Sequence, residues 1–318
     1  MNGDLGAPVE YVADDQKIEK GAHDVTDVDS ARAMIDEFIN LRIDALLATN
    51  DQRPSLLLSG GIDSILIASY LSDKSPDVLA VHFCISDDYV GRKERSIAAA
   101  VAEGLGMEFV VAEPTSEEFG CVAQSVAHDL SSADVWEVCA GAVLRCCDDV
   151  ARKHGANGLI FTGAGADALF CGGKTLTPAE WASTVQGEIA SHFTYHRNIP
   201  DFYSRILADP ERHVQLWQSH RATQIAQKLN PYVVRGKDFG CDKWLFREMA
   251  KQRGIAPSFC FTNKDPMQSS SGAIRALECS ARLMLSRDKS HIAYSDPLEE
   301  SSENIIGRLW LMLGQGQK

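Results

Sequence analysis

The sequence has no long apolar run. None of its segments approaches the ~18 consecutive apolar residues that a membrane-spanning helix needs, so we expect no transmembrane segment in its 318 residues. The first residues, Met1 to Asp4, carry no basic flank and lead into no apolar stretch. We therefore expect no secretory signal peptide.

Basic residues are also scarce. The chain has 31 Lys and Arg against 44 Asp and Glu, which gives a formal net charge of −13. A general nucleic-acid binder needs a basic stripe to neutralise phosphates, so we expect no nucleic-acid partner, although a local groove for ATP or a tRNA is compatible with this charge. A hydrophobic content of 45% with 24% charged residues is typical of a globular protein with a sizeable core.

The cysteines show no C-x-x-C spacing, and their number is odd. This argues against a zinc ribbon and against a disulfide scaffold. Because most of them lie within apolar runs, we expect buried, reduced thiols and a cytoplasmic protein. They are Cys84, Cys121, Cys139, Cys146, Cys147, Cys171, Cys241, Cys260 and Cys279.

Strand and helix patterns alternate over the first half of the chain. Residues 1–28 are acidic and lack periodicity, which predicts a loosely ordered tail. Ser30 is a candidate N-cap for a helix whose apolar residues recur at helical spacing up to Leu47. Beyond it, the predicted strands are 56–58, 78–83, 109–111 and 159–161, and helical patterns include 92–105 and 136–154.

This alternation predicts an α/β fold, a doubly wound parallel sheet with helices on both faces. We assign residues 29–180 to this core. From about Trp181 the strand signal disappears, so residues 181–318 are predicted to be a mainly helical C-terminal part that completes the site. The helical segments expected there are 212–229, 241–251, 273–285 and 304–313.

A glycine turn follows the first predicted strand, at Ser59-Gly60-Gly61-Ile62-Asp63-Ser64. Two glycines let the backbone turn tightly and approach a ligand, and the next helix offers unpaired N–H groups to an anion. No lysine follows the glycines, so this is not the loop of the common P-loop NTPases. A carboxylate such as Asp63 fits a phosphate cradle when Mg²⁺ bridges the two.

A second glycine-rich segment, residues 162–173, follows the fourth predicted strand and contains Asp167. Two carboxylates at neighbouring strand ends, Asp63 and Asp167, can hold Mg²⁺ against a triphosphate. The alternative is a loop with a solvated aspartate. A third polar segment, residues 262–272, contains Lys264, which by itself would be interpreted as a solvated lysine.

Together these segments resemble the N-type ATP pyrophosphatases (the PP-loop superfamily). The first is similar to their pyrophosphate loop. The second is similar to the G-x-G-A-D-E-L-F-G-G-Y signature of asparagine synthetases, and the third to a K-x-x-x-Q-x-x-S-G loop of archaeal-type members. Asp134 to Val138, the helix around Arg221 and Pro231-Tyr232 also resemble that family, over about residues 30–290.

The resemblance implies ATP and Mg²⁺ as cofactors, with ATP cleaved between its α and β phosphates. Asp63 and Asp167 would hold Mg²⁺, and Lys264 would stabilise charge at the α-phosphate as the catalytic residue. The main chain and apolar side chain near Phe83 would contact adenine. The implied ATP-binding set is Leu57, Ser59, Gly60, Gly61, Asp63, Ser64, Phe83, Thr162 and Gly163.

The acceptor side departs from that signature. Ala168 replaces its glutamate, Ala164 stands where related enzymes carry Glu or Tyr, and Lys174 replaces its final tyrosine. The attacking amine needs a general base, and Glu180, Asp238 and Asp242 are candidates only because they lie near these segments. Too few residues precede Ser59 for a glutaminase, so we expect the nitrogen to come from ammonia, a separate protein or an amine substrate.

A weaker pattern places Glu188, His192 and His196 at four-residue spacing. This spacing allows a zinc site, but a polar helix face explains it more simply.

The sequence as a whole predicts an ATP-dependent ligase that adenylates a carboxylate and forms an amide. Its expected partners are a small-molecule carboxylate, an amine or ammonia and a possible nitrogen donor. The alternatives are a PP-loop enzyme acting on a nucleobase or RNA, and a non-catalytic nucleotide-binding relative. The oligomeric state and the substrates are not predicted.

Overall fold

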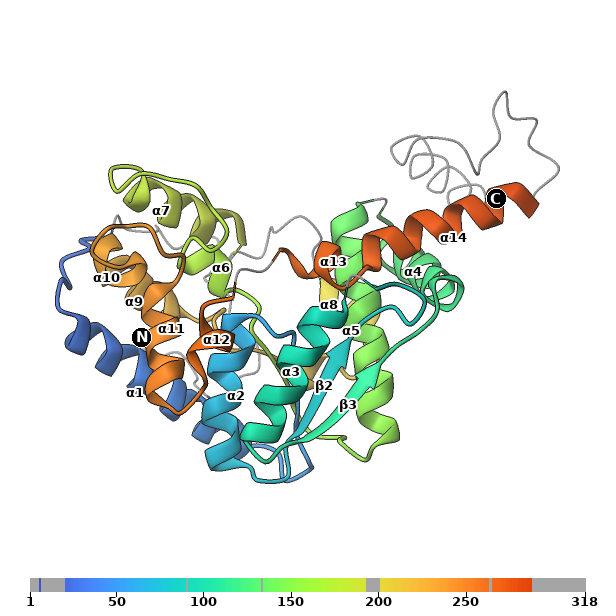
Figure 1. Ribbon diagram of the computed structural model, residues 1–318, viewed down its shortest axis with the longest axis horizontal. Coiled ribbons are helices and arrows are strands. Elements are labelled where there is room, and N and C mark those ends of the chain that lie inside the picture. Colours follow the sequence, from blue (N-terminus) through green and yellow to red (C-terminus); the bar gives the residue numbers. More distant parts are fainter. Residues whose placement is uncertain are drawn as a thin grey trace.

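The computed structural model describes Gly6 and residues 21–89, 91–132, 134–192, 201–262 and 265–287. Helices precede, separate and follow five short strands (Figure 1). The strands are β1 Ser55–Leu57, β2 Leu79–Phe83, β3 Glu108–Ala112, β4 Ile160–Thr162 and β5 His213–Gln215. The helices are α1 Val28–Leu47, α2 Ile62–Lys74, α3 Arg92–Gly104, α4 Ser116–Leu130, α5 Val135–Lys153, α6 Ala166–Leu169, α7 Trp181–His192, α8 Phe202–Ile206, the 3₁₀ helix η1 Pro210–Arg212, α9 His220–Lys228, α10 Pro231–Arg235, α11 Trp244–Gln252, α12 Pro257–Cys260, α13 Met267–Ser270 and α14 Ala273–Arg287.

The strands form one parallel sheet in the order β3-β2-β1-β4-β5. The predicted doubly wound α/β fold and the four predicted strands are therefore confirmed. The fifth strand, β5, corrects the prediction that residues 212–229 are helical, because the helix there begins only at His220. Its residues His213, Val214 and Gln215 do not form an apolar run, and β5 is held by its pairing with β4.

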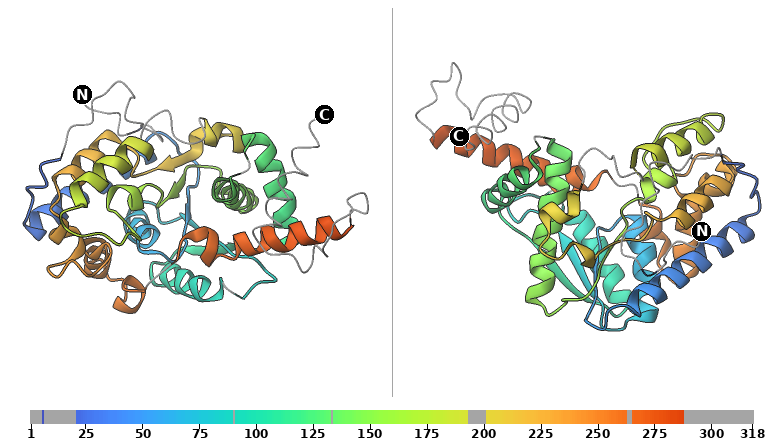
Figure 2. Two further views of the ribbon diagram at one scale, coloured as in Figure 1. Left: turned by 90° about the horizontal axis from the view of Figure 1, so that it is seen from above. Right: turned by 180° about the vertical axis from the view of Figure 1, so that it is seen from behind.

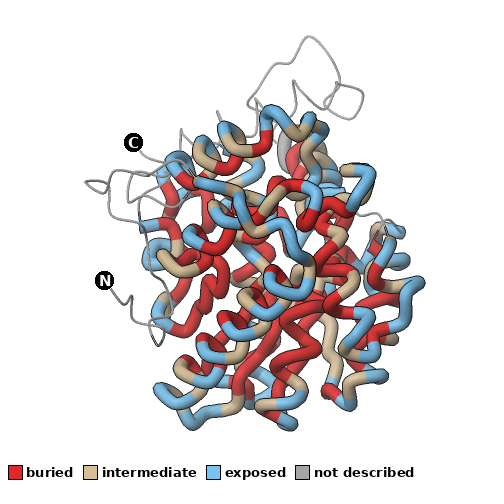
Figure 3. The backbone as a smooth tube through the Cα atoms, turned by 90° about the vertical axis from the view of Figure 1, so that its left-hand side faces the viewer, coloured by how far each residue is buried: buried red, intermediate tan, exposed pale blue. Residues whose placement is uncertain are grey.

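Both faces of the sheet are buried. In β2, Ala80 belongs to one hydrophobic core, whereas its neighbours Leu79 and Val81 belong to the other. Since successive side chains of a strand point to opposite faces, both faces of this strand carry apolar residues, and His82 is its one polar residue. The first core includes residues of α1, α2, α3, α7, α9 and α11, and the second includes residues of α4, α5, α8 and α14 (Figures 1 and 3).

Two helix starts differ from the sequence prediction. Helix α1 is capped by Asp27, whose carboxylate accepts a hydrogen bond from the main chain of Ser30, so the predicted N-cap Ser30 lies inside the helix. Helix α4 was not predicted, although Thr115 and Glu118 form a capping box at its start.

The C-terminal half packs against the sheet and its helices (Figure 2). The residues just before α1 lie beside the end of α9, because the main chains of His23 and Val25 donate hydrogen bonds to the carbonyls of Gln227 and Lys228. The helices predicted at 241–251 and 273–285 correspond to α11 and α14, while residues 304–313 lie outside the described part of the chain. Among the described helices, none has the length and apolar character needed to cross a membrane.

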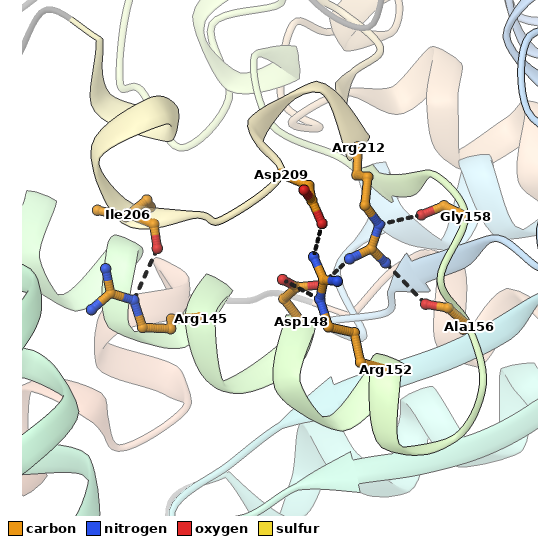
Figure 4. A network of polar contacts seen from close by, with 8 residues as sticks. All are labelled: Arg145, Asp148, Arg152, Ala156, Gly158, Ile206, Asp209 and Arg212. Atoms are coloured by element: carbon orange, nitrogen blue, oxygen red, sulfur yellow. Dashed lines mark hydrogen bonds and ion pairs between the residues drawn. The ribbon is translucent and has the colours of Figure 1, made fainter.

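A buried arginine ties the edge of the sheet to α5 (Figure 4). Arg212, just before β5, donates hydrogen bonds to the carbonyls of Gly158 and Ala156 at 2.8 and 2.9 Å. Its guanidinium also lies 2.6 Å from the carboxylate of Asp148 on α5. Asp148 and Arg212 are both buried, so their ion pair is a strong contact. It holds the residue before β5 in place, although the sequence of β5 does not itself favour a strand.

Candidate functional site

The strand order reverses direction between β1 and β4. From β1 the chain proceeds through β2 to β3 on one side, whereas β4 leads to β5 on the other. In doubly wound sheets, ligands bind beyond the carboxyl ends of the strands at such a switch point. The two glycine-rich segments predicted from the sequence follow these two strands, at Ser59–Ser64 and Thr162–Gly173.

The first segment forms a tight turn. Gly60 has a φ of +77°, and Gly61 is the N-cap of α2 without a side-chain cap. The hydroxyls of Ser59 and Ser64 lie 3.1 Å apart, and the Ser64 hydroxyl accepts a hydrogen bond from the main chain of Ser59 and donates one to the Gly61 carbonyl. The first turn of α2 therefore leaves main-chain N–H groups available to an anion.

The second segment packs directly on the first. A Cβ atom at Gly163 would lie 2.9 Å from Cβ of Asp63 and 3.1 Å from the main-chain nitrogen of Ser64. Only a glycine allows this approach, which is a reason for glycine that the sequence alone does not reveal. Thr162, the last residue of β4, is buried, and its hydroxyl lies 3.4 Å from the carbonyl of Val214 on β5.

Lys243 joins the two segments, and no sequence pattern pointed to it. Its Nζ atom lies 2.5 Å from Oδ2 of Asp63 and also forms an ion pair with Oδ1 of Asp167. The lysine side chain is 3% exposed, against 71% for Asp167, so the ion pair reaches from the interior to the surface. A side chain at Gly172 would overlap both Asp167 and Lys243.

The backbone supports this placement of Lys243. Its φ and ψ of 47° and 41° put it in the left-handed region as the N-cap of α11. A non-glycine residue keeps such a conformation only where its surroundings hold it there. No local pattern marks it in the sequence, because a lysine that begins a helix is usually solvated.

Burial and charge shape the titration of this pair. Burial raises the pKa of Asp63 to about 6, an effect that the nearby Lys243 ammonium opposes and the Asp167 carboxylate reinforces. For Lys243, burial by itself lowers the pKa, but the two carboxylates outweigh it and leave the pKa above its usual value. Above the pKa of Asp63, its carboxylate therefore faces the ammonium of Lys243.

The residues fit a divalent cation. Oxygens of Asp63 and Asp167 converge on one nitrogen atom, so a single hard cation could contact both. Moreover, Oδ1 of Asp63 is buried and has no hydrogen-bond partner among the residues that the structure describes. An unpartnered buried carboxylate oxygen is costly unless a further ligand completes its shell.

The third predicted segment is docked beside the first. The hydroxyl of Ser270 on α13 donates a hydrogen bond of 2.9 Å to Glu94 on α3, and the carbonyl of Ser271 accepts one from the main chain of Ile85. Glu94 in turn lies against the first segment, because a Cβ at Gly60 would come within 2.9 Å of the carbonyl oxygen of Glu94. Lys264 itself lies outside the described residues.

The remaining predicted nucleotide contacts lie at the ends of β1 and β2. Leu57 is the half-buried last residue of β1. Phe83 ends β2, but its ring is 6% exposed and packs at 5.4 Å from Phe119 of α4. Its position at the carboxyl end of a strand agrees with a main-chain contact more readily than with a contact of the ring.

The candidate bases are separated by the structure. Glu180 caps the main chain of Thr177, and Asp238 is exposed. Of the three, only Asp242 borders the cluster. It precedes Lys243, and its Oδ2 accepts a hydrogen bond of 3.3 Å from the main chain of Gly173. Its Oδ1 is buried, and no described residue forms a hydrogen bond with it.

Most of the weaker pattern of Glu188, His192 and His196 lies outside the described residues. Glu188 forms an ion pair of 2.8 Å with Lys174, whereas the side chain of His192 and all of His196 lie outside the described residues. Among the residues that the structure describes, no group of three His, Cys, Asp or Glu side chains is placed to hold a metal ion. At the switch point two carboxylates, those of Asp63 and Asp167, contact the same atom. Mg²⁺ sites in proteins usually use one or two carboxylates.

Comparison with known proteins identifies one family. A family model described as asparagine synthase matches residues 45–239, which include the first two segments and end just before Lys243. A search of curated proteins gives no match.

Solved structures share only low identity with the chain. An NH3-dependent NAD synthetase from Campylobacter jejuni subsp. jejuni is 14% identical, with a TM-score of 0.37 over 92% of this chain and 95% of that one. An NMN synthetase from Francisella tularensis is 12% identical, with a TM-score of 0.33 over 74% of this chain and 98% of that one.

Proposed function

This chain belongs to the asparagine synthase family of the PP-loop superfamily, and we propose that it is an ATP-dependent, AMP-forming ligase that joins a carboxylate to an amine or to ammonia. One observation carries the proposal. The carboxylates of Asp63 and Asp167 converge beside an uncapped helix start, at the switch point of a parallel sheet. This arrangement suits a metal-bound triphosphate.

The first segment binds the leaving pyrophosphate. Main-chain N–H groups at the start of α2 and the hydroxyl of Ser59 donate hydrogen bonds to its oxygens, as does the hydroxyl of Ser64 once it leaves the Gly61 carbonyl. The positive end of the helix dipole favours the charge of the pyrophosphate. Gly60, Gly61 and Gly163 keep side chains out of this space.

Asp63 and Asp167 would hold Mg²⁺. When bound, the cation would offset negative charge on the phosphate oxygens and orient the triphosphate. The ammonium of Lys243 lies beside the same carboxylates and would supply a further positive charge to the phosphates. Lys264, on the basis of the sequence resemblance, donates to the α-phosphate in both steps.

The proposed reaction has two steps. In the first, an oxygen of the substrate carboxylate attacks the α-phosphorus of ATP, the bond from that phosphorus to the α,β-bridging oxygen breaks, and pyrophosphate leaves. The amine nitrogen then attacks the acyl carbon, the carbon–oxygen bond to AMP breaks, and the amine loses a proton to a base. Free ammonia, a separate protein or an amine on the acceptor supplies the nitrogen.

A pyrophosphate-release assay tests the proposal. The full chain is incubated with ATP, Mg²⁺ and pools of amino acids, other carboxylates and amines, and AMP is quantified in parallel. We expect equal amounts of pyrophosphate and AMP with one pool, and a loss of at least ~100-fold in the Asp63→Asn variant, because an essential electrostatic contact is removed.

The control is Asp73→Asn, a change of the same kind at the other end of α2, where the aspartate is 70% exposed. It should keep wild-type turnover. ATP binding without any AMP formation across all pools would favour a non-catalytic relative, and AMP formation only with RNA or a nucleobase would favour the modifying enzymes of the superfamily. Wild-type turnover in Asp63→Asn would refute the proposed site.

A further inference from the structure

The place between Asp63 and Asp167 already contains a cation, the ammonium of Lys243. This nitrogen contacts one oxygen of each carboxylate, which are the same two groups that the proposed function assigns to Mg²⁺. A lysine ammonium and a divalent cation cannot both lie between Oδ2 of Asp63 and Oδ1 of Asp167, because two positive charges in that space repel each other. A metal that binds this pair of oxygens must therefore displace the lysine from them.

We propose that Lys243 is an internal cation that makes metal binding depend on the nucleotide. Without nucleotide, the ammonium pairs with both aspartates and offsets one of their two negative charges, so a free divalent cation binds weakly. When the metal arrives with ATP, the triphosphate gives the displaced ammonium a new anionic partner in the same place. This inference rests on the proposed function, because it assumes that the site receives a metal–triphosphate complex.

The charge balance supports the weak affinity for free metal. Two carboxylates and one ammonium leave a net charge of −1 on the cluster, against −2 when the lysine is removed. Affinity for a hard cation follows the number of charged ligands that are free to bind it. If the carboxylates are free in only a small fraction of molecules, the apparent affinity for the metal falls by that fraction.

The burial of Lys243 makes displacement by metal alone costly. Its side chain is 3% exposed, so an ammonium that leaves the two aspartates without another anion would stay in a poorly solvated place. Phosphate oxygens at the start of α2 would remove this cost, because the loop Ser59–Ser64 lies directly before and around Asp63.

The test measures metal binding without turnover. Mn²⁺, which is paramagnetic, replaces Mg²⁺, and electron paramagnetic resonance counts the free ion while it is titrated into the full chain without nucleotide. We expect weak binding to the wild type and at least tenfold tighter binding to Lys243→Met. Lys251→Met, the same change in the last turn of the same helix at a lysine that is 46% exposed, should bind Mn²⁺ as the wild type does.

A double variant locates the metal. Adding Asp63→Asn to Lys243→Met should abolish the gain in affinity, because the released carboxylate is then absent. Equal Mn²⁺ affinities of the wild type and Lys243→Met, or a gain that survives Asp63→Asn, would overturn the inference.

The wild type alone can refute the inference. Micromolar binding of Mn²⁺ to the wild type without nucleotide overturns the inference even if Lys243→Met does not fold. Calorimetry with the α,β-methylene analogue of ATP and Mn²⁺ examines the proposed function. If the wild type does not bind this analogue, the proposed function fails, whereas tight binding of Mn²⁺ alone together with normal binding of the analogue contradicts only the role of Lys243.

Discussion

Lys243 and Asp63 lie 180 positions apart in the chain, yet Nζ of the lysine is 2.5 Å from Oδ2 of the aspartate. The contact joins the start of α11 to the first turn of α2, and the two helices pack against each other. It makes the C-terminal half a part of the site that follows β1 and β4. The following predictions examine this contact, the turn before it and the support of the sheet edge.

Removing the ammonium should destabilise the fold in a way that depends on pH. Lys243→Met leaves the buried Asp63 without its counter-charge, and breaking a buried pair in this way costs about 3 kcal/mol of the free energy of unfolding. The pKa of Asp63, already raised to about 6, should rise further in the variant, whereas an unfolded aspartate titrates near 3.8.

The direction of the pH effect follows from proton binding. Between the two pKa values the folded variant binds more protons than the unfolded chain, so its stability falls as pH rises through this window and stays low above the folded pKa. Urea unfolding of variant and wild type should therefore show the largest deficit at about pH 8 and a smaller one at about pH 5. A deficit that grows as pH falls would contradict the pairing of Lys243 with Asp63.

The turn of the first segment should not tolerate a side chain at Gly60. Its φ is +77°, and an added Cβ would lie 2.9 Å from the carbonyl oxygen of Glu94. Gly60→Ala should lower the free energy of unfolding by about 2 kcal/mol, from the backbone conformation and the steric contact together. It should also weaken binding of the ATP analogue, measured by calorimetry.

Gly106 is the matched control for that variant. Its φ is +68°, but nothing lies within 4 Å of an added Cβ, so Gly106→Ala carries only the backbone cost of about 1 kcal/mol. Urea unfolding of the two variants separates the two contributions. Equal losses would show that the contact with Glu94 does not constrain the turn.

The buried arginine at the edge of the sheet should matter more than its exposed neighbour. Arg212 makes two hydrogen bonds to carbonyls and an ion pair with Asp148, whereas Arg152, which also pairs with Asp148, is 32% exposed. Arg212→Met should cost about 3–5 kcal/mol of the free energy of unfolding because it leaves a buried carboxylate with less compensation. Arg152→Met should cost at most about 1 kcal/mol.

Thermal and urea unfolding of both arginine variants check this difference. The order of the two losses is the informative result. If Arg152→Met proved the more damaging, the sheet edge would depend on the surface part of the network in Figure 4 rather than on its buried part.

Much of the α/β core could be predicted because its signals are local. The runs that became β1 to β4 are apolar and short, and glycines mark the turns after β1 and β4. Helix α4 also had a readable signal, the capping box of Thr115 and Glu118, although it was not predicted. By contrast, β5 has only one apolar residue, Val214, and depends on its pairing with β4 and on Arg212.

The site divides in the same way. Asp63 and Asp167 could be proposed from the sequence because each follows a strand and a glycine turn, and parallel strands end at one edge of the sheet. Their contact with a common cation could not be proposed, because Lys243 comes from a helix with no motif.

The sequence by itself determined the family, the parallel sheet and the two glycine-rich segments, since these depend on residue types at short spacing. The tertiary structure decided which charge stands between the two aspartates. Lys243 approaches Asp63 because α11 packs on α2. The residues around Lys243 show no pattern that would predict this contact from the sequence.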